Sequence, residues 1–215
     1  MTRALSRRWL CALAVLSVSL PFAAFAGSPA DDPTQFVDAA MHDMAIALET
    51  PATATTPTRS EQLHAVLTHY FDIAQLGRNS VGAAWLLVAP ERQAAFVVTL
   101  ENFLITGYCG GIVRPGELSF GPAHVIPSAA PAEASGRIAV AIEARGSDGD
   151  THLIRLALAR RDDGEYRIVD VSAESISLGR LLAEDFGAVL HRNGGHVEAL
   201  AVALQDKIAA RSRDK

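Results

Sequence analysis

The segments RIAVAIEAR (137–145), THLIRLALARR (151–161) and EYRIVDVSA (165–173) decide the fold of this chain. Apolar residues alternate with polar or small ones along each segment, the period-two pattern of β-strands. The connecting segments GSDGD (146–150) and DDG (162–164) both contain an Asp-Gly pair, which is typical of tight hairpin turns. We therefore expect an antiparallel meander. A further strand near AHVIP (123–127) would make a sheet of about four strands.

One face of this predicted sheet is branched and apolar, whereas the other is rich in alanine. Ile138, Val140 and Ile142 share a face of the first strand. On the second strand Leu156 takes the central position, where we expect Val140 and Val169 as its neighbours on the flanking strands. Periodicity alone leaves two interpretations open: a close-packed core, or a strongly curved sheet that encloses an apolar pocket.

Segments with helical periodicity lie on both sides of the strands. Before the sheet we predict a helix over 33–49, a second that begins near Arg59, and a third from Pro90 that ends on glycines after Cys109. After the sheet, two apolar stripes predict helices over 178–190 and 197–208. Helices, a locally connected antiparallel sheet and helices again indicate an α+β fold.

Residues 1–26 have the features of a cleaved secretory signal peptide. Arginines precede the apolar run WLCALAVLSVSLPFAAF, and an A-x-A site at 24–26 comes directly before Gly27. The length of the apolar run favours the general secretion route over the twin-arginine route. The remaining chain, residues 27–215, has a size that predicts one domain.

The charge of the predicted mature chain argues against nucleic acid as a partner. Three of the 19 basic residues leave with the signal peptide, so 16 basic residues face 24 acidic ones and the net charge is about −8. Nucleic-acid binding needs a basic surface, and adhesion to anionic lipid head groups needs one too. Any interaction with lipid must therefore depend on apolar surface.

Motifs for metal, nucleotide or nucleophilic chemistry are not found. The seven histidines include no H-x-H pair, no H-E-x-x-H and no pair at i, i+4 spacing, so we expect no metal site. No G-x-S-x-G, Walker loop or C-x-x-C occurs either. Cys109 lies at an apolar helix end, where a packed thiol is a better interpretation than a nucleophile.

A polar cluster ends the third strand, within YRIVDVSAESISLG (166–179). Asp170 and Glu174 would be an acid/base pair if one of them had a raised pKa and a suitable companion. The alternative is structural, because Ser177 is well placed to cap the helix that follows. We favour strand termination and helix capping.

The chain resembles the MlaC family of periplasmic phospholipid-binding proteins, also called toluene-tolerance proteins. The first half carries these motifs in order: FD (71–72), GAAW (82–85), PE (90–91), Phe96, FL (103–104) and Tyr108. In the second half, YRIVDVSAESISL is similar to the family's strand ending D-V-x-x-E-G-x-S-L, and Phe186 and GGHVEALAVALQDKI (194–208) follow at the family's spacing. Ser175 stands where the family has glycine, and Ala183 where it has arginine.

The resemblance implies an α+β fold in which a strongly curved sheet and the N- and C-terminal helices surround an apolar cavity. It implies a periplasmic carrier, without cofactor, metal or catalytic residues. The carrier would hold phospholipid acyl chains and shuttle lipid between an inner-membrane ABC-type transporter complex and an outer-membrane lipoprotein complex. The side chains expected to line the cavity are Trp85, Leu100, Phe103, Leu104, Tyr108, Val140, Ile142, Ile154, Leu156, Val169, Val171 and Phe186.

Three other functions stay open at this point. Hopanoid-associated HpnM proteins are also similar, so a hopanoid is an alternative cargo. A small isomerase or dehydratase for an apolar substrate could use Asp170 or Asp72 as its base. A periplasmic adaptor without ligand would fill the apolar side of the sheet with ordinary core.

Overall fold

The predicted meander forms the centre of the sheet. The structure, a computed structural model, describes residues 32–50, 58–109, 118–126 and 136–213. The three long strands are β3 (Arg137–Gly146), β4 (Thr151–Arg160) and β5 (Tyr166–Ala173), all antiparallel. Gly149 and Gly164 in the two connecting turns have φ of 89° and 86°, a region that glycine enters without steric cost.

Short strands extend the meander on both sides. β1 (Leu118–Phe120) and β2 (His124–Val125) both pair with β3, and β6 (Ile176–Ser177) pairs with β5. The order is β1-β3-β4-β5-β6, with β2 beside β3. The strand expected near AHVIP is therefore confirmed as β2, and the curved antiparallel sheet has six strands instead of about four.

A β-bulge interrupts the pairing of β4 with β5. Leu158 lies opposite Ile168, but the next residue of β4, Ala157, lies opposite Asp170, which leaves Val169 as the additional residue. An additional residue reverses the alternation of side chains beyond it. Val171 therefore becomes the cross-strand neighbour of Leu156. The expectation that Val169 flanks Leu156 is wrong because the hairpin pairs Leu158 with Ile168, which turns Val169 to the opposite face. The bulge then places Val171, instead of Asp170, beside Leu156.

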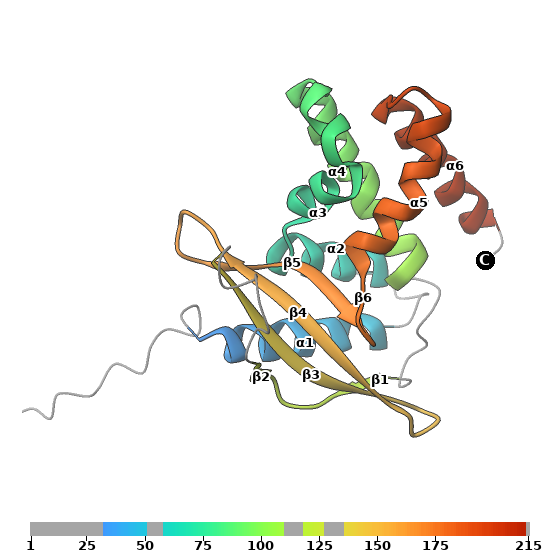
Figure 1. The fold of residues 1–215 in the computed structure, drawn as a ribbon. Helices are drawn as coiled ribbons and strands as arrows, with labels where there is room; N and C mark the ends of the chain where they lie inside the picture. Colours follow the sequence, from blue (N-terminus) through green and yellow to red (C-terminus); the bar gives the residue numbers. More distant parts are fainter. Residues whose placement is uncertain (1–31, 51–57, 110–117, 127–135, 214–215) are drawn as a thin grey trace, which may run out of the picture.

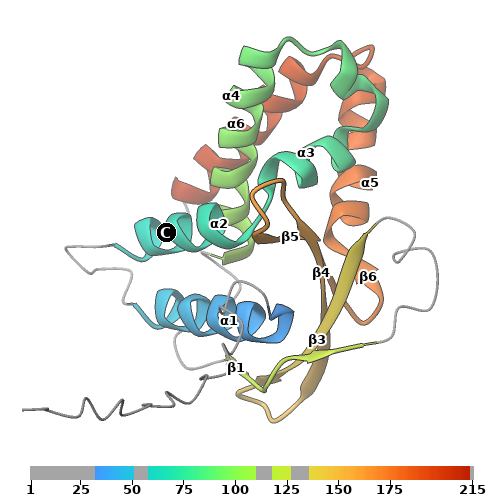
Figure 2. The ribbon, with the colours of Figure 1, turned by 90° about the vertical axis from the view of Figure 1, so that its left-hand side faces the viewer.

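Two helices lie in the curve of the sheet. α1 (Pro33–Glu49) lies on the concave side of the sheet, between β1 and α2 (Arg59–Tyr70) in Figure 2, and α2 packs beside it (Figures 1 and 2). Both begin where their sequence predicts, because Asp32 caps α1 ahead of a proline and Thr58 forms a capping box with Glu61. The ring of Phe36 on α1 lies 6.0 Å from that of Tyr166 on β5, so α1 packs against the face of the sheet that carries Tyr166.

The other helices form a bundle at the β5 side of the sheet (Figure 1). They are α3 (Ile73–Val81), the 3₁₀ turn η1 (Gly82–Leu87), α4 (Pro90–Leu104), α5 (Leu178–Arg192) and α6 (Val197–Arg213). The helix predicted from Pro90 through Cys109 is α-helical only to Leu104 and then becomes a π-helical turn, η2 (Ile105–Cys109). The predicted α+β class is confirmed.

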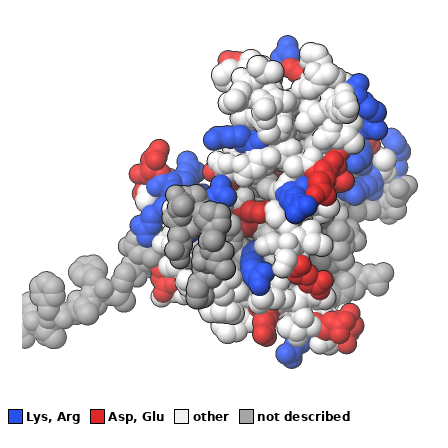
Figure 3. Space-filling model, viewed as in Figure 1, with Lys and Arg blue, Asp and Glu red and all other residues white. Residues whose placement is uncertain are grey.

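Most buried apolar side chains of the described residues form one cluster that runs from the sheet into the bundle. Charged side chains of both signs are scattered over the face seen in Figure 3, with wide uncharged areas between them. Among the helices that the structure describes, none combines the length and the apolar character needed to cross a bilayer. The predicted signal peptide, residues 1–26, lies outside the described residues.

Candidate functional site

A row of aliphatic side chains crosses the concave face of the sheet. Val140 pairs with Leu156, which in turn pairs with Val171, so the three lie side by side on β3, β4 and β5. Val140 and Leu156 are 0% and 1% exposed, whereas Val171 is only partly buried. A parallel row of Ile142 and Ile154 lies next to it. Five of the predicted lining residues are therefore brought together, and the row becomes less buried toward β5.

The β5 end of this row opens into an apolar recess on the surface. The recess has a volume of about 380 Å³ and is lined by Val171, Ala173, Glu174, Ile176, Ser177, Leu178 and Leu181. Ile176 is 63% exposed and Leu181 is also exposed, although both are large apolar side chains. Because Val171 belongs to both the row and the recess, a continuous apolar track leads from the interior of the sheet to solvent.

Sequence reasoning missed the outer wall of this recess. Leu178 and Leu181 belong to the apolar stripe that predicts the helix over 178–190, and neither they nor Ile176 are among the predicted lining residues. A signal existed, because Ile176 is an isolated apolar residue between two serines at a polar strand end. The solvent exposure of Ile176 could not be predicted from this pattern, because it depends on the direction in which α5 leaves the sheet.

Asp170 and Ser177 hold the start of α5 against β5. Ser177 accepts a hydrogen bond from the backbone N–H of Arg180 at 3.1 Å, so the predicted helix cap is confirmed. Asp170 accepts from the Ser177 hydroxyl at 2.5 Å and from the backbone N–H groups of Gly179 at 3.0 Å and Val171 at 2.9 Å. These contacts join the last turn of the sheet to the first turn of α5 and so shape the recess.

The carboxylates considered as an acid/base pair have separate partners. Glu174 is exposed and lies 2.8 Å from the Nδ1 atom of His152, whereas Asp170 is engaged at the helix start. Asp72, the other candidate base, accepts from the backbone N–H of Gln75 at 2.8 Å and caps α3. Capping and strand termination therefore account for Asp170 and Asp72. Among the residues that the structure describes, no group of three or more His, Cys, Asp or Glu side chains could hold a metal ion.

The predicted lining residues on the helices lie mainly in the bundle. Trp85 packs edge-on against Phe96 at 5.9 Å, and Phe186 packs against Phe96 at 6.5 Å and against Phe103 at 6.4 Å. Leu100 is fully buried close to α3, where a Cβ atom added to Gly77 would come within 3.3 Å of its Cδ2 atom. The structure thus places Trp85, Leu100, Phe103 and Phe186 in an interlocked helical core.

Three predicted residues remain. Leu104, at the end of α4, is buried in the common apolar cluster. Val169 is buried but lines a polar hollow together with Asp72 and Arg167. It directly follows Ile168, which lies opposite Leu158 on the concave side, and so it points to the other face of the sheet. The side chain of Tyr108 lies outside the described part of the structure.

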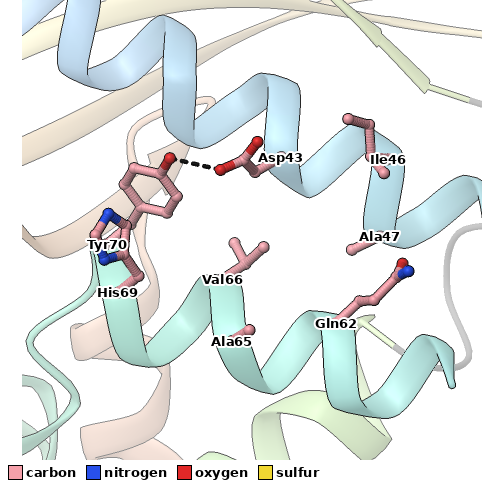
Figure 4. A pocket seen from close by; sticks show the side chains of 8 residues that line it. All are labelled: Asp43, Ile46, Ala47, Gln62, Ala65, Val66, His69 and Tyr70. Atoms are coloured by element: carbon pink, nitrogen blue, oxygen red, sulfur yellow. Dashed lines mark hydrogen bonds between the residues drawn. The ribbon is translucent and has the colours of Figure 1, made fainter. Parts of the chain in front are cut away.

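A second groove runs between α1 and α2 (Figure 4). It has a volume of about 490 Å³ and is lined by Asp43, Ile46, Ala47, Gln62, Ala65, Val66, His69 and Tyr70. The Tyr70 hydroxyl donates to Asp43 at 2.6 Å at one end, and Thr50 contacts Gln62 at the other. Burial, followed by the hydrogen bond to Asp43, raises the pKa of Tyr70 to about 12. The pair of helices is thus joined by polar contacts at its ends and is open between them.

Comparisons with known proteins agree with this architecture. Among solved structures, the chain is similar to the phospholipid-binding protein from Ralstonia solanacearum, determined in complex with a phospholipid. The TM-score is 0.67 at 16% sequence identity, and the alignment covers 84% of this chain and 99% of that chain, a similarity that shows the fold. No curated protein matches the sequence. The family model described as MlaC protein matches residues 38–206, from α1 to α6, and with it the row, the recess and the bundle, so this chain belongs to the MlaC family.

Proposed function

We propose that this protein is a periplasmic carrier that binds the acyl chains of a phospholipid along the concave face of the sheet. The observation that carries the proposal is the apolar track from Val140 through Leu156 and Val171 to the recess beside α5. Acyl chains would replace protein contacts along the buried part of this track. The head group would then lie at the recess, where apolar lining meets solvent.

The hydrophobic effect is sufficient to hold such a cargo. With about 0.8 kcal/mol per buried methylene, two chains of roughly fifteen methylenes each gain on the order of 24 kcal/mol relative to water. A bilayer offers the lipid nearly the same gain, so net transfer must come from proteins that dock with the carrier. We propose an inner-membrane ABC-type transporter complex and an outer-membrane lipoprotein complex as these partners, which is the role that the MlaC resemblance implies.

Export of the chain is part of the same proposal. Residues 1–26 would direct the protein to the periplasm and be removed, which leaves residues 27–215 as the carrier. Expression of the full chain in a Gram-negative host followed by periplasmic extraction tests this step. Intact-mass measurement should then give a chain that begins at Gly27, whereas an uncleaved chain held in the membrane fraction would contradict it.

Native mass spectrometry of this periplasmic protein tests the cargo. We expect a mass shift of one or two phospholipids that disappears on denaturation, and recovery of the same lipid by solvent extraction. A hopanoid in the extract would change the cargo class and keep the carrier mechanism. Well-folded protein without any lipid would contradict the proposal, and turnover of a small apolar substrate would favour an enzyme.

A variant at Leu156 tests the track itself. In Leu156→Arg, the long side chain can follow the track toward Val171 and bring its guanidinium to the recess, as arginine does at apolar surfaces. We therefore expect a folded but less stable protein whose lipid content falls sharply. Lipid content and circular dichroism melting should be measured on one preparation. A folded variant with normal lipid content would show that the cargo lies elsewhere, for example between α1 and α2.

A further inference from the structure

A polar hollow lies at the end of the β4–β5 hairpin, between the sheet and α3. Its volume is about 650 Å³, and its lining includes five arginines and three aspartates. The hollow is thus net positive, in a chain whose formal net charge is −5. In Figure 3, blue side chains gather around this end of the hairpin, and red side chains lie at its tip.

The register of the sheet explains how the hollow forms. Arg137 lies opposite Ala159, and Ala159 lies opposite Arg167, so two arginines flank one alanine on three adjacent strands. Side chains directly opposite one another share a face of the sheet, and each strand spacing is about 4.8 Å. The methyl group of Ala159 therefore leaves a gap between two long cationic side chains, and Arg78 from α3 lines the same hollow.

This face is the opposite one from the apolar track. The adjacent row, Ile138, Leu158 and Ile168, belongs to the apolar cluster, and side chains alternate between the two faces of a strand. The sheet backbone therefore separates the hollow from the cargo that we propose. A ligand bound here would leave the track and the recess free.

The arginines differ in how they are held. Arg167 forms the fixed part, because it donates to the Tyr166 carbonyl oxygen at 2.8 Å and lies 3.0 Å from Glu165, with its side chain only 13% exposed. The side chains of Arg78 and Arg137 make no hydrogen bond or ion pair with any residue that the structure describes. Within the described residues, two of the arginines around the hollow are therefore available to an anion.

The aspartates of the hollow do not neutralise these two arginines. Asp72 is engaged as the cap of α3, and Asp163 lies 3.6 Å from Arg161 in an exposed pair. Asp162 and Asp163 are exposed in the hairpin turn. A flat anionic membrane would meet these carboxylates first, whereas a narrow chain can pass beside them to the arginines. The shape and charge of the hollow therefore favour a polypeptide over a bilayer.

We propose that this arginine hollow binds an acidic segment of a partner protein, with Asp or Glu side chains between Arg78, Arg137 and Arg167. Guanidinium groups bind carboxylates through paired, charge-assisted hydrogen bonds. Arg137 and Arg167 lie two strand spacings apart and Arg78 lines the same hollow, an arrangement that fits several carboxylates better than one small ion. The proposal is independent of the cargo, because it concerns the opposite face of the sheet.

Fluorescence anisotropy with a labelled hexaglutamate peptide tests the proposal on the periplasmic protein. We expect saturable binding that weakens as salt rises, and a loss of at least about tenfold in affinity in Arg78→Gln/Arg137→Gln. The control is Arg145→Gln/Arg180→Gln, which removes the same charge from exposed positions elsewhere and should change affinity less than about twofold. Ala159→Leu keeps every charge, fills the gap and should also weaken binding.

Two parallel titrations separate the alternatives. Inorganic phosphate should compete only weakly, and vesicles of phosphatidylglycerol should not bind through these arginines. Equal losses of peptide affinity in the double variant and in its control would overturn the proposal, because binding would then depend only on the overall charge of the protein. Vesicle binding that requires Arg78 and Arg137, or phosphate that competes as well as the peptide, would overturn it in favour of a membrane or a small anion.

Discussion

The helical bundle and the concave side of the sheet are both buried, but they are packed in different ways. In the bundle, Phe96, Phe103 and Phe186 meet edge-to-face, and Gly77 allows α3 to approach Leu100 closely. On the sheet, the corresponding residues are aliphatic, and Val140, Leu156 and Val171 form a row that ends in an open recess.

The difference matters because aromatic packing depends on ring geometry, whereas aliphatic packing depends mainly on filled volume. Methylene groups of a lipid can replace aliphatic side-chain contacts at little cost. They cannot reproduce three interlocked phenyl rings. We therefore regard the bundle as the rigid part of the molecule and the sheet with α1 and α2 as the part that accommodates cargo.

The largest expected effect comes from placing the same charge in each region. Leu200 on α6 and Leu156 on β4 are both 1% exposed. Leu200→Arg has no apolar track to follow, so an unpaired buried arginine should cost several kcal/mol, comparable with the stability of a whole domain. We expect that Leu200→Arg does not fold, whereas Leu156→Arg folds but contains little lipid. Circular dichroism of both variants checks this, and equal behaviour would remove the distinction between the regions.

The junction between the regions should be less sensitive. Asp170→Ala removes the acceptor of two backbone N–H groups and of the Ser177 hydroxyl, and we expect a loss of about 2 kcal/mol in the free energy of unfolding. Glu174→Gln alters only an exposed contact with His152 and should cost less than about 0.5 kcal/mol. Urea unfolding gives both values. Lipid should still bind to both variants, and its loss would give Asp170 or Glu174 a role beyond structure.

The stability of the contact between α1 and α2 should depend on Tyr70. Tyr70→Phe removes its hydrogen bond to Asp43 and should cost about 1 kcal/mol at neutral pH. Because folding raises the pKa of Tyr70 from 10.0 to about 12, the neutral phenol stabilises the fold below pH 10, and this contribution is lost as pH rises toward 12. The difference in melting temperature between wild type and Tyr70→Phe should therefore shrink from pH 10 to 12. A constant difference would contradict this role.

The smallest expected effect is a gain in stability at the recess. Glu174 and Ser175 form the two-residue turn between β5 and β6 and have φ of 51° and 73°. Residues other than glycine are strained in this region, which gives a physical reason for the glycine that the resemblance leads us to expect at position 175. Ser175→Gly should raise the free energy of unfolding by about 0.5 kcal/mol, measured by urea unfolding, without changing lipid content. Ser175→Val is the matched opposite and should destabilise the turn.

Local chemistry accounts for the parts of the fold that were predicted well. The meander was predicted from alternation and from two Asp-Gly turns. The helices from Pro33 and Pro90 were predicted from their opening prolines, and the start of α5 from its cap Ser177. Each of these signals acts within a few residues, where backbone geometry and hydrogen bonding are decided by the neighbouring side chains. Tertiary contacts can therefore change them little.

The candidate site was predicted less completely. Val140, Ile142 and Leu156 were assigned to one face correctly. The expected position of Val169 beside Leu156 was wrong because it needs a hairpin register one residue away from the observed one, and a period of two does not fix the register. Trp85, Leu100, Phe103 and Phe186 were expected around the same cavity as the sheet residues. Helical periodicity identifies a buried stripe without showing which other helix covers it.

The sequence alone therefore determined the α+β order, the apolar and alanine faces of the strands, the Ser177 cap and the resemblance to the MlaC family. The three-dimensional arrangement decided the bulge, the apolar track into the recess, and the meeting of Arg137 and Arg167 across Ala159. The physical reason is the range of the interactions. A side chain's direction depends on its own backbone, whereas its neighbours on other strands depend on register, and register is set by the packing of the whole sheet.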